Sequence, residues 1–152
     1  MINKKEIAND ILLNEVRNLI SEGHTVTIRA KGVSMHPFLD HLRDKINLVP
    51  FNSLSVGDVV LAEIDKGLFV LHRIINISGD KLTLMGDGNI CAKEYCDKKD
   101  AIAIMSGFIR NGKEWSCDSK KWKKYSSLWM KLYPVRRWLL AIYRRSKKLF
   151  NI

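Results

Sequence analysis

The residues best suited to catalysis are a serine and a histidine that lie 38 positions apart, Ser34 and His72. Ser34 belongs to the run Gly-Val-Ser-Met-His-Pro at residues 32–37, whose glycine and proline predict a tight turn that exposes the hydroxyl. A serine hydroxyl attacks a carbonyl carbon only when a neighbouring base removes its proton. The pair therefore suits nucleophilic catalysis if folding brings it together. Alternatively, Ser34 only caps a short helical turn at residues 38–42.

His72 is predicted to lie on a β-strand that covers residues 68–77. The alternation of side chains along a strand places it on one face with Val70 and Ile74, among aliphatic neighbours. Such surroundings favour the neutral imidazole, which is the form that accepts a proton near pH 7. The alternative is a histidine with a purely structural role.

An acidic residue that could orient the imidazole is Asp87, in the run Gly-Asp-Gly-Asn at residues 86–89. This run directly follows a predicted strand, and its glycines permit an unusual turn that aims the carboxylate back at the sheet. There it could hold His72 and stabilise the imidazolium formed on proton transfer. Closing the turn is the simpler structural role for Asp87.

A helix followed by short strands is predicted to position these residues. Apolar residues recur at helical spacing over residues 4–20, namely Ile7, Ile11, Leu12, Val16, Leu19 and Ile20. Strands are predicted at residues 25–30, 46–49, 58–64, 68–77, 81–85 and 101–109. The turn residues between them indicate hairpins in a mainly antiparallel sheet, so the expected fold is mainly β (α+β). We expect an N-terminal helix at 1–24, a β domain at 25–112 and a basic aromatic tail at 113–152.

Positive charge is concentrated in the tail. The formal net charge is +10, and residues 119–152 contain 11 Lys or Arg and no Asp or Glu. Beyond Pro134 the sequence predicts a basic amphipathic helix, whose apolar stripe comprises Val135, Trp138, Leu139, Ile142 and Tyr143. This helix either docks on the β domain or lies on an anionic membrane. The predicted membrane contacts are Arg136, Arg137, Trp138, Arg144 and Arg145.

Nucleic acid is the less favoured partner. Trp115, Trp122 and Trp129 alternate with lysines that could contact phosphates, but no nucleic-acid-binding motif accompanies them. A single helix before residue 25 is also too little for a helix-turn-helix.

The three cysteines, Cys91, Cys96 and Cys117, predict neither a disulfide framework nor a metal site. They are odd in number, lack Cys-x-x-Cys spacing and have no histidine near them. We therefore expect a reducing compartment and no metal or other cofactor. The sequence has no signal peptide and no apolar run of membrane-spanning length. These features predict a cytoplasmic protein that the basic helix could bring to the inner face of the membrane.

Four motifs in order resemble the type I signal peptidase superfamily, which includes the self-cleavage domains of SOS-type repressors. They are Gly-x-Ser-Met-x-Pro-Phe-Leu at 32–39, Val-Gly-Asp-Val-Val at 56–60, His-Arg-Ile-Ile at 72–75 and Gly-Asp-Gly-Asn at 86–89. The resemblance covers residues 25–109. Because His72 stands where many members have a lysine, the chain most resembles the archaeal and endoplasmic-reticulum branch of the superfamily. It implies a coiled antiparallel β fold with Ser34 as nucleophile and His72 as base.

The resemblance also bears on the rest of the site. Many members have an oxyanion-donating serine where this chain has Gly32, so the turn containing Gly32 and Met35 must supply main-chain N–H groups such as that of Ser34. An acid beyond the Gly-Asp motif corresponds to the region of Glu94, so Asp87 or Glu94 would orient His72.

The implied activity is a serine endopeptidase that cleaves a leader or signal-like peptide from a peptide or protein precursor through an acyl-enzyme. Such peptidases are usually membrane-anchored, whereas no anchor is expected here, so the precursor need not be a secreted one. The alternative is a weakly active or inactive module of the same fold. It would bind or regulate at a membrane surface or on nucleic acid through its tail.

Overall fold

The protein is an α+β molecule built on one antiparallel sheet, as seen in a computed structural model that describes residues 4–150, with side chains from Leu12 to Leu149. The described part has three α-helices, α1 (Lys4–Ser21), α2 (Lys120–Lys131) and α3 (Arg136–Phe150). The eight strands are β1 (Val26–Arg29), β2 (Lys45–Val49), β3 (Val59–Asp65), β4 (Leu68–Ser78), β5 (Lys81–Met85), β6 (Glu94–Asp97), β7 (Ala101–Arg110) and β8 (Lys113–Ser116). Two short 3₁₀ helices complete the structure, η1 (Lys98–Asp100) and η2 (Tyr133–Val135).

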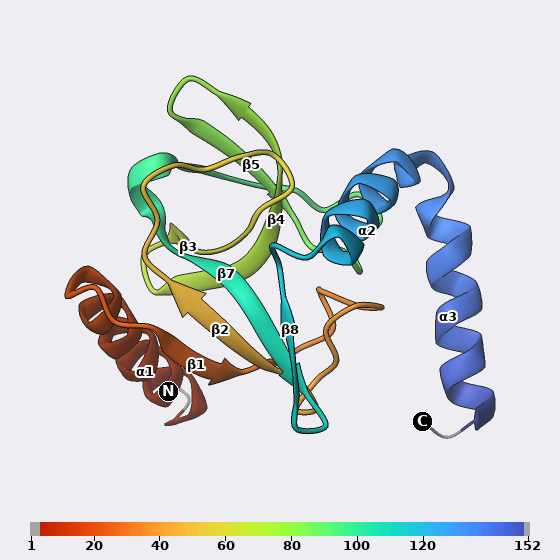
Figure 1. Ribbon diagram of the computed structural model, residues 1–152, viewed down its shortest axis with the longest axis horizontal. Coiled ribbons are helices and arrows are strands. Elements are labelled where there is room, and N and C mark those ends of the chain that lie inside the picture. The colour runs from red at the N-terminus through yellow and green to blue at the C-terminus, as the bar shows by residue number, and fades with distance from the viewer. Residues whose placement is uncertain (1–3, 151–152) are drawn as a thin grey trace.

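The strand order is β1-β2-β7-β3-β4-β5-β6, with β8 paired to the end of β7, and the sheet is open (Figure 1). Every pairing is antiparallel, and β7 links the N-terminal strands β1 and β2 to the β3–β4–β5–β6 meander. In the β3–β4 hairpin His72 lies opposite Val60, and in the β5–β6 pair Leu84 lies opposite Glu94. Leu84 also lies opposite Ile74 of β4, so this register places Glu94, at the start of β6, level with the middle of β4, where His72 lies.

The sheet buries apolar side chains on both faces. Along β3, Val59 and Leu61 pack into one cluster with residues of α1 and the loop after β1, while Val60 and Ala62 pack into a second cluster with β4 and β5. Adjacent strand residues point to opposite faces, so one strand serves both clusters. Apolar packing on both faces therefore fixes the strands in place, and the loops that join them are anchored to a rigid sheet.

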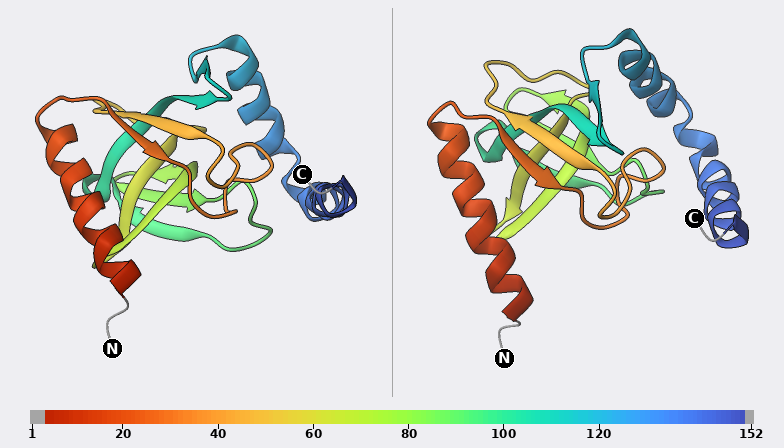
Figure 2. Two further views of the ribbon diagram at one scale, coloured as in Figure 1. Left: turned by 90° about the horizontal axis from the view of Figure 1, so that it is seen from below. Right: turned by 60° about the horizontal axis from the view of Figure 1, so that its bottom comes forward.

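The helices α1 and α3 lie at opposite ends of the molecule, with α1 next to β1 and β7 and α3 beyond α2 (Figures 1 and 2). Val16 and Ile20 of α1 are buried in the first cluster; the side chains of Ile7 and Ile11, predicted to share this stripe, lie outside the described residues. Trp122 and Trp129 of α2 are also buried, which shows that these tryptophans pack on the body. In the described part of the chain no helix is long and apolar enough to cross a membrane.

The predicted α+β antiparallel architecture is confirmed, and the predicted strands match β1 to β5 and β7 to within about two residues at their ends. The sequence did not predict β6, β8 or α2. Residues 38–42 do not form a helical turn that Ser34 could cap, but consecutive turns and a bend. Leu42 there has a φ of 59°, which a helix does not accommodate.

Candidate active site

Ser34 lies on a turn that directly follows β1 and is braced by its own main chain. Gly32, with a φ of 85°, donates its N–H to His41 Nδ1 at 2.8 Å, and Leu39 N donates to Met35 O at 2.9 Å. Met35 is buried, whereas Ser34 is half-buried. The turn is thus fixed from beneath by Met35, and it leaves Ser34 near the surface.

His72 is held by Glu94. Its Nδ1 lies 2.8 Å from Glu94 Oε2, and the imidazole is only 5% exposed. A histidine that donates its Nδ1 proton to a carboxylate carries its free lone pair on Nε2. The pairing therefore selects the tautomer in which Nε2 is the base.

The Gly86–Gly88 turn lies between His72 Nε2 and the main chain of Ser34. A Cβ on Gly86 would lie 2.3 Å from the main-chain carbonyl oxygen of Ser34 and 3.0 Å from His72 Nε2, so only glycine fits between the Ser34 main chain and the imidazole. Gly88 N then donates to Ser34 O at 2.7 Å. The two residues, distant in sequence, are neighbours across this turn because neither glycine has a side chain.

Ser34 and His72 also line one cavity of about 470 Å³ between α1 and the sheet. Its walls are mainly apolar, and they include Leu12, Ile28, Leu39, Ile46, Leu61, Phe69 and Leu71. Its rim comes from the end of β1 and the turn after it, including Lys31 and Gly32. A cavity of this size with a few polar groups at one end is typical of a ligand site.

Asp87 is not paired with His72. Both of its oxygens accept hydrogen bonds from Arg73, at 2.8 Å from Nε and 2.6 Å from Nη2, and both residues are buried. Arg73 Nη1 donates further to Gly57 O and to Ser126 Oγ of α2. Of the two acids considered for orienting the histidine, Glu94 therefore contacts His72, whereas Asp87 pairs with Arg73, the next residue of β4.

The helix α2 closes over this ion pair. Tyr125 donates its hydroxyl to Asp87 Oδ2 at 3.3 Å, and Trp129 Nε1 donates to Asp87 O at 3.1 Å. Burial raises the pKa of Tyr125, so its hydroxyl stays protonated as a donor. Sequence reasoning missed Arg73 as a site-supporting residue, although a charged residue inside an otherwise apolar strand was a signal that it has a buried partner.

The helix α3 contacts the loops on both sides of the site. Lys147 Nζ donates to both oxygens of Asp40, and Arg144 donates to Gly88 O at 3.1 Å. The Tyr143 ring meets the His36 ring edge-on with their centroids 5.7 Å apart. The helix α3 thus contacts both the turn that carries Ser34 and the Gly86–Gly88 turn, which lies between Ser34 and His72.

Two of the predicted membrane contacts lie on the inner side of α3. Arg136 is 2% exposed and donates to Trp129 O, and Arg144 is engaged with Gly88. Arg136 is therefore part of the interface between α2 and α3 rather than a surface contact. Arg144 is nevertheless exposed, as are Arg137, Trp138 and Arg145.

No protein-family model and no curated protein matches this chain. Its function is therefore inferred from the site itself.

Two of the three cysteines are unsuited to nucleophilic attack, and no metal site is found among the described residues. Burial raises the pKa of the Cys96 thiol to about 11 and that of Cys117 to about 12, so both stay protonated at neutral pH and are poor nucleophiles. No cluster of three or more His, Cys, Asp or Glu side chains in the described part could hold a metal ion.

Breaking the buried ion pair should destabilise the whole fold. Asp87→Asn leaves the Arg73 guanidinium buried without its counter-charge, and we expect a loss of about 3–5 kcal/mol in the free energy of unfolding. Urea denaturation measures this, with the exposed Asp80→Asn as the matched control. A loss for Asp87→Asn within about 0.5 kcal/mol of that control would contradict the role given to this pair.

The contact between α3 and the serine turn should make stability pH-dependent. Burial lowers the pKa of His36 below its usual 6.5, despite the opposing charge of Asp40, and Lys147 and Arg144 lower it further. His36 Nε2 lies 2.8 Å from Asp40 Oδ1, in a contact whose geometry is not that of a hydrogen bond, and the nitrogen is buried without a hydrogen-bond partner. As the pH falls below 6.5 the unfolded chain binds the proton first, so the stability present above 6.5 is progressively lost.

We expect the free energy of unfolding to fall with a slope of up to about 1.4 kcal/mol per pH unit below pH 6.5. Comparing His36→Asn with the exposed His24→Asn isolates this contribution. The first variant should flatten the slope between pH 6.5 and 5, and the second should not. Equal slopes in wild type and His36→Asn would refute it.

Proposed function

We propose that the protein is a serine endopeptidase in which Ser34 is the nucleophile, His72 the general base and Glu94 the residue that orients the base. One observation carries this proposal. Glu94 occupies Nδ1 of His72. A Cβ on Gly86 would lie 3.0 Å from the other nitrogen, Nε2, and 2.3 Å from the main-chain carbonyl oxygen of Ser34, so the main chain that carries the Ser34 hydroxyl lies beside the proposed base, and both residues line one cavity. A nucleophile, a base and an orienting acid in this relation are the parts that acyl transfer needs.

The four sequence motifs support a peptidase of the signal peptidase type, because all four meet at this site. Residues 32–39 form the serine turn, and His72 and Arg73 come from the third motif. The second motif provides Gly57 O, which accepts from Arg73, and the fourth provides the Gly86–Gly88 turn. Motifs that are dispersed in sequence but adjacent in space are expected of a shared site.

The surroundings of the site favour an extended peptide as substrate. The strand β1 is at the end of the sheet, and the cavity runs along it from Thr27 to Ser34. A peptide can add to such an edge through main-chain hydrogen bonds while its alternate side chains enter the apolar cavity. This suits the processing of a leader or signal-like segment of a precursor.

The mechanism proceeds through an acyl-enzyme. His72 Nε2 takes the Ser34 proton as Oγ attacks the peptide carbonyl carbon, and the resulting imidazolium is stabilised by Glu94. Collapse of the tetrahedral intermediate breaks the C–N bond, and the imidazolium gives its proton to the leaving amine. Water, deprotonated by His72, then attacks the ester and releases the acid product and Ser34.

The tetrahedral oxyanion needs main-chain donors in the serine turn. The N–H of Gly32 donates to His41, so the proposed donor is the N–H of Ser34 itself, as in other acyl-transfer enzymes that use the amide of the nucleophile. Met35 acts beneath the turn, where its sulfur accepts from Asp87 N at 3.5 Å.

Labelling with a fluorophosphonate probe tests the assignment without knowledge of the natural substrate. We expect one covalent adduct, located on Ser34 by peptide mass spectrometry. Ser34→Ala should abolish it, and His72→Ala should slow labelling by about 10³-fold or more because the hydroxyl then lacks its base. Glu94→Gln should cause a smaller loss.

The exposed Ser53→Ala serves as the matched control and should label at the wild-type rate. Thermal melting of each variant separates a catalytic loss from unfolding. An adduct on another residue, or equal labelling of Ser34→Ala and wild type, would exclude the nucleophile. Absence of labelling in folded wild-type protein would favour a binding module of the same fold.

A second substitution tests the close approach of the two residues. Gly86→Ala places a methyl group against Ser34 O and beside His72 Nε2, so the serine turn must move away from the base. We expect labelling of Ser34 to slow by at least about tenfold, since small misplacements of reacting groups are costly. Gly79→Ala, in a hairpin away from the site, has open space around the new methyl group but strains the main chain because Gly79 has a φ of 57°, so it controls for destabilisation by a glycine substitution. Equal labelling rates for the two variants would contradict the proposed geometry.

A further inference from the structure

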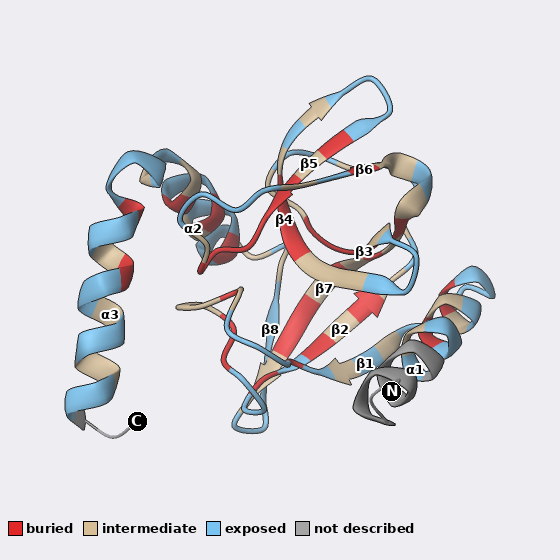
Figure 3. Cartoon of the chain, turned by 180° about the vertical axis from the view of Figure 1, so that it is seen from behind, coloured by how far each residue is buried: buried red, intermediate tan, exposed pale blue. Residues whose placement is uncertain are grey.

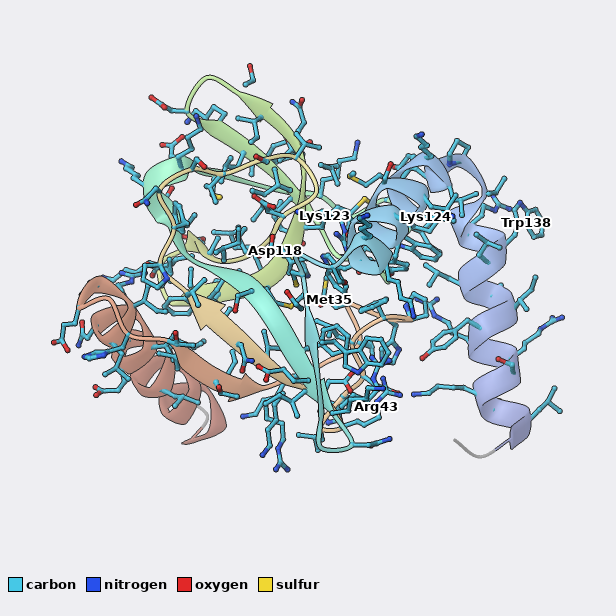
Figure 4. All side chains as sticks on the ribbon, in the orientation of Figure 1. Met35, Arg43, Asp118, Lys123, Lys124 and Trp138 are labelled. Atoms are coloured by element: carbon cyan, nitrogen blue, oxygen red, sulfur yellow. The ribbon has the colours of Figure 1, made fainter. Side chains whose placement is uncertain are left out.

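The outer face of α3 is apolar and unoccupied in the described structure. Trp138, Ile142 and Leu149 are 62%, 66% and 80% exposed. Together with Arg145 they recur at helical spacing on one side, opposite Arg136, Leu140, Tyr143 and Lys147. Figure 3 shows an exposed outer side and a partly buried inner side of α3, and Figure 4 shows Trp138 pointing away from the sheet.

The inner face holds α3 in place, so the outer face has a fixed orientation. Leu140 is fully buried, and Lys147 and Arg144 bind Asp40 and Gly88. The predicted apolar stripe is therefore divided: Leu139 and Tyr143 are half-buried, whereas Val135, Trp138 and Ile142 are exposed. Docking on the body thus accounts for only part of the helix's apolar surface.

Positive charge lies within this outer face and along one side of it. Arg137 and Lys148 lie along one side of it, Arg145 lies within it, and all three are exposed. The Arg137 guanidinium lies over the Trp138 ring, 4.7 Å from its centroid. Residues 119–152 contain no acidic side chain to repel an anionic partner.

We infer that this outer face of α3, comprising Trp138, Ile142, Arg145 and Leu149 with Arg137 and Lys148 beside it, binds the surface of an anionic lipid bilayer. A helix with exposed Trp, Ile and Leu and with Arg and Lys beside them lies in the interface, with its apolar side chains among the acyl chains and its cations at the headgroups. Binding to nucleic acid would use the cations but would leave the aliphatic residues exposed. The inference does not depend on peptidase activity.

Co-sedimentation of the full chain with vesicles tests it. Wild type should bind vesicles of phosphatidylcholine with about 30% phosphatidylglycerol and bind pure phosphatidylcholine much more weakly, with the difference reduced at high salt. The triple variant Trp138→Ala, Ile142→Ala, Leu149→Ala should lose at least about tenfold in partitioning. Arg137→Gln and Arg145→Gln should each lose up to about fivefold.

The matched control is Val56→Ala, Leu68→Ala, Tyr95→Ala, which removes three exposed apolar side chains from the body and should leave binding unchanged. Trp138→Phe should keep binding but lose most of the blue shift of tryptophan emission that vesicles induce in wild type. Ser34→Ala should bind like wild type, so failure of this inference and failure of the peptidase assignment are distinguishable.

Three results would overturn the inference. They are equal vesicle binding by the α3 triple variant and its control, equal binding of wild type to neutral and anionic vesicles, and absent vesicle binding. If wild type does not bind vesicles, loss of self-association in the triple variant would indicate a second copy of the chain as the partner. Loss of oligonucleotide binding in the triple variant would indicate nucleic acid instead.

Discussion

The ion pair between Arg73 and Asp87 is the interaction on which the rest of the site depends. Both groups are buried, and a buried charge is tolerated only when it is paired and hydrogen-bonded. The pair ties β4 to the Gly86–Gly88 turn, and α2 completes it through Tyr125 and Ser126. Arg73 directly follows His72, so the same strand that holds the turn also presents the proposed base.

The turn fixed by this pair determines how closely the serine and the histidine approach. Gly86 and Gly88 pack against the main chain of the Ser34 turn, and Glu94 restrains the imidazole from the other side. None of these contacts comes from neighbouring positions in the chain. The site therefore forms only when the sheet, the turn and α2 are assembled, and α3 then adds contacts to the Ser34 and Gly88 loops.

The failures of sequence reasoning have identifiable causes. The strands β6 and β8 are short and polar at many positions, and pairing with β5 and β7 gives them their structure. Hydrophobic alternation is a weak guide to such strands. The helix α2 did carry a signal: Ser119 is its N-cap, and Trp122, Ser126 and Trp129 lie at helical spacing and are buried. Considered only as aromatic residues interleaved with lysines, these tryptophans by themselves predict no helix.

The α+β class, α1, most strands and the basic amphipathic helix α3 could be predicted from the amino-acid sequence, which also singled out Ser34 and His72 as candidate site residues. These follow from periodicity, turn residues and side-chain chemistry, which are local properties. The contact of Glu94 with His72, the contact of Asp87 with Arg73 and the exposed side of α3 could be seen only in the folded structure. Those outcomes depend on strand register and on which charged groups are buried together, and both are set by contacts between segments far apart in the chain.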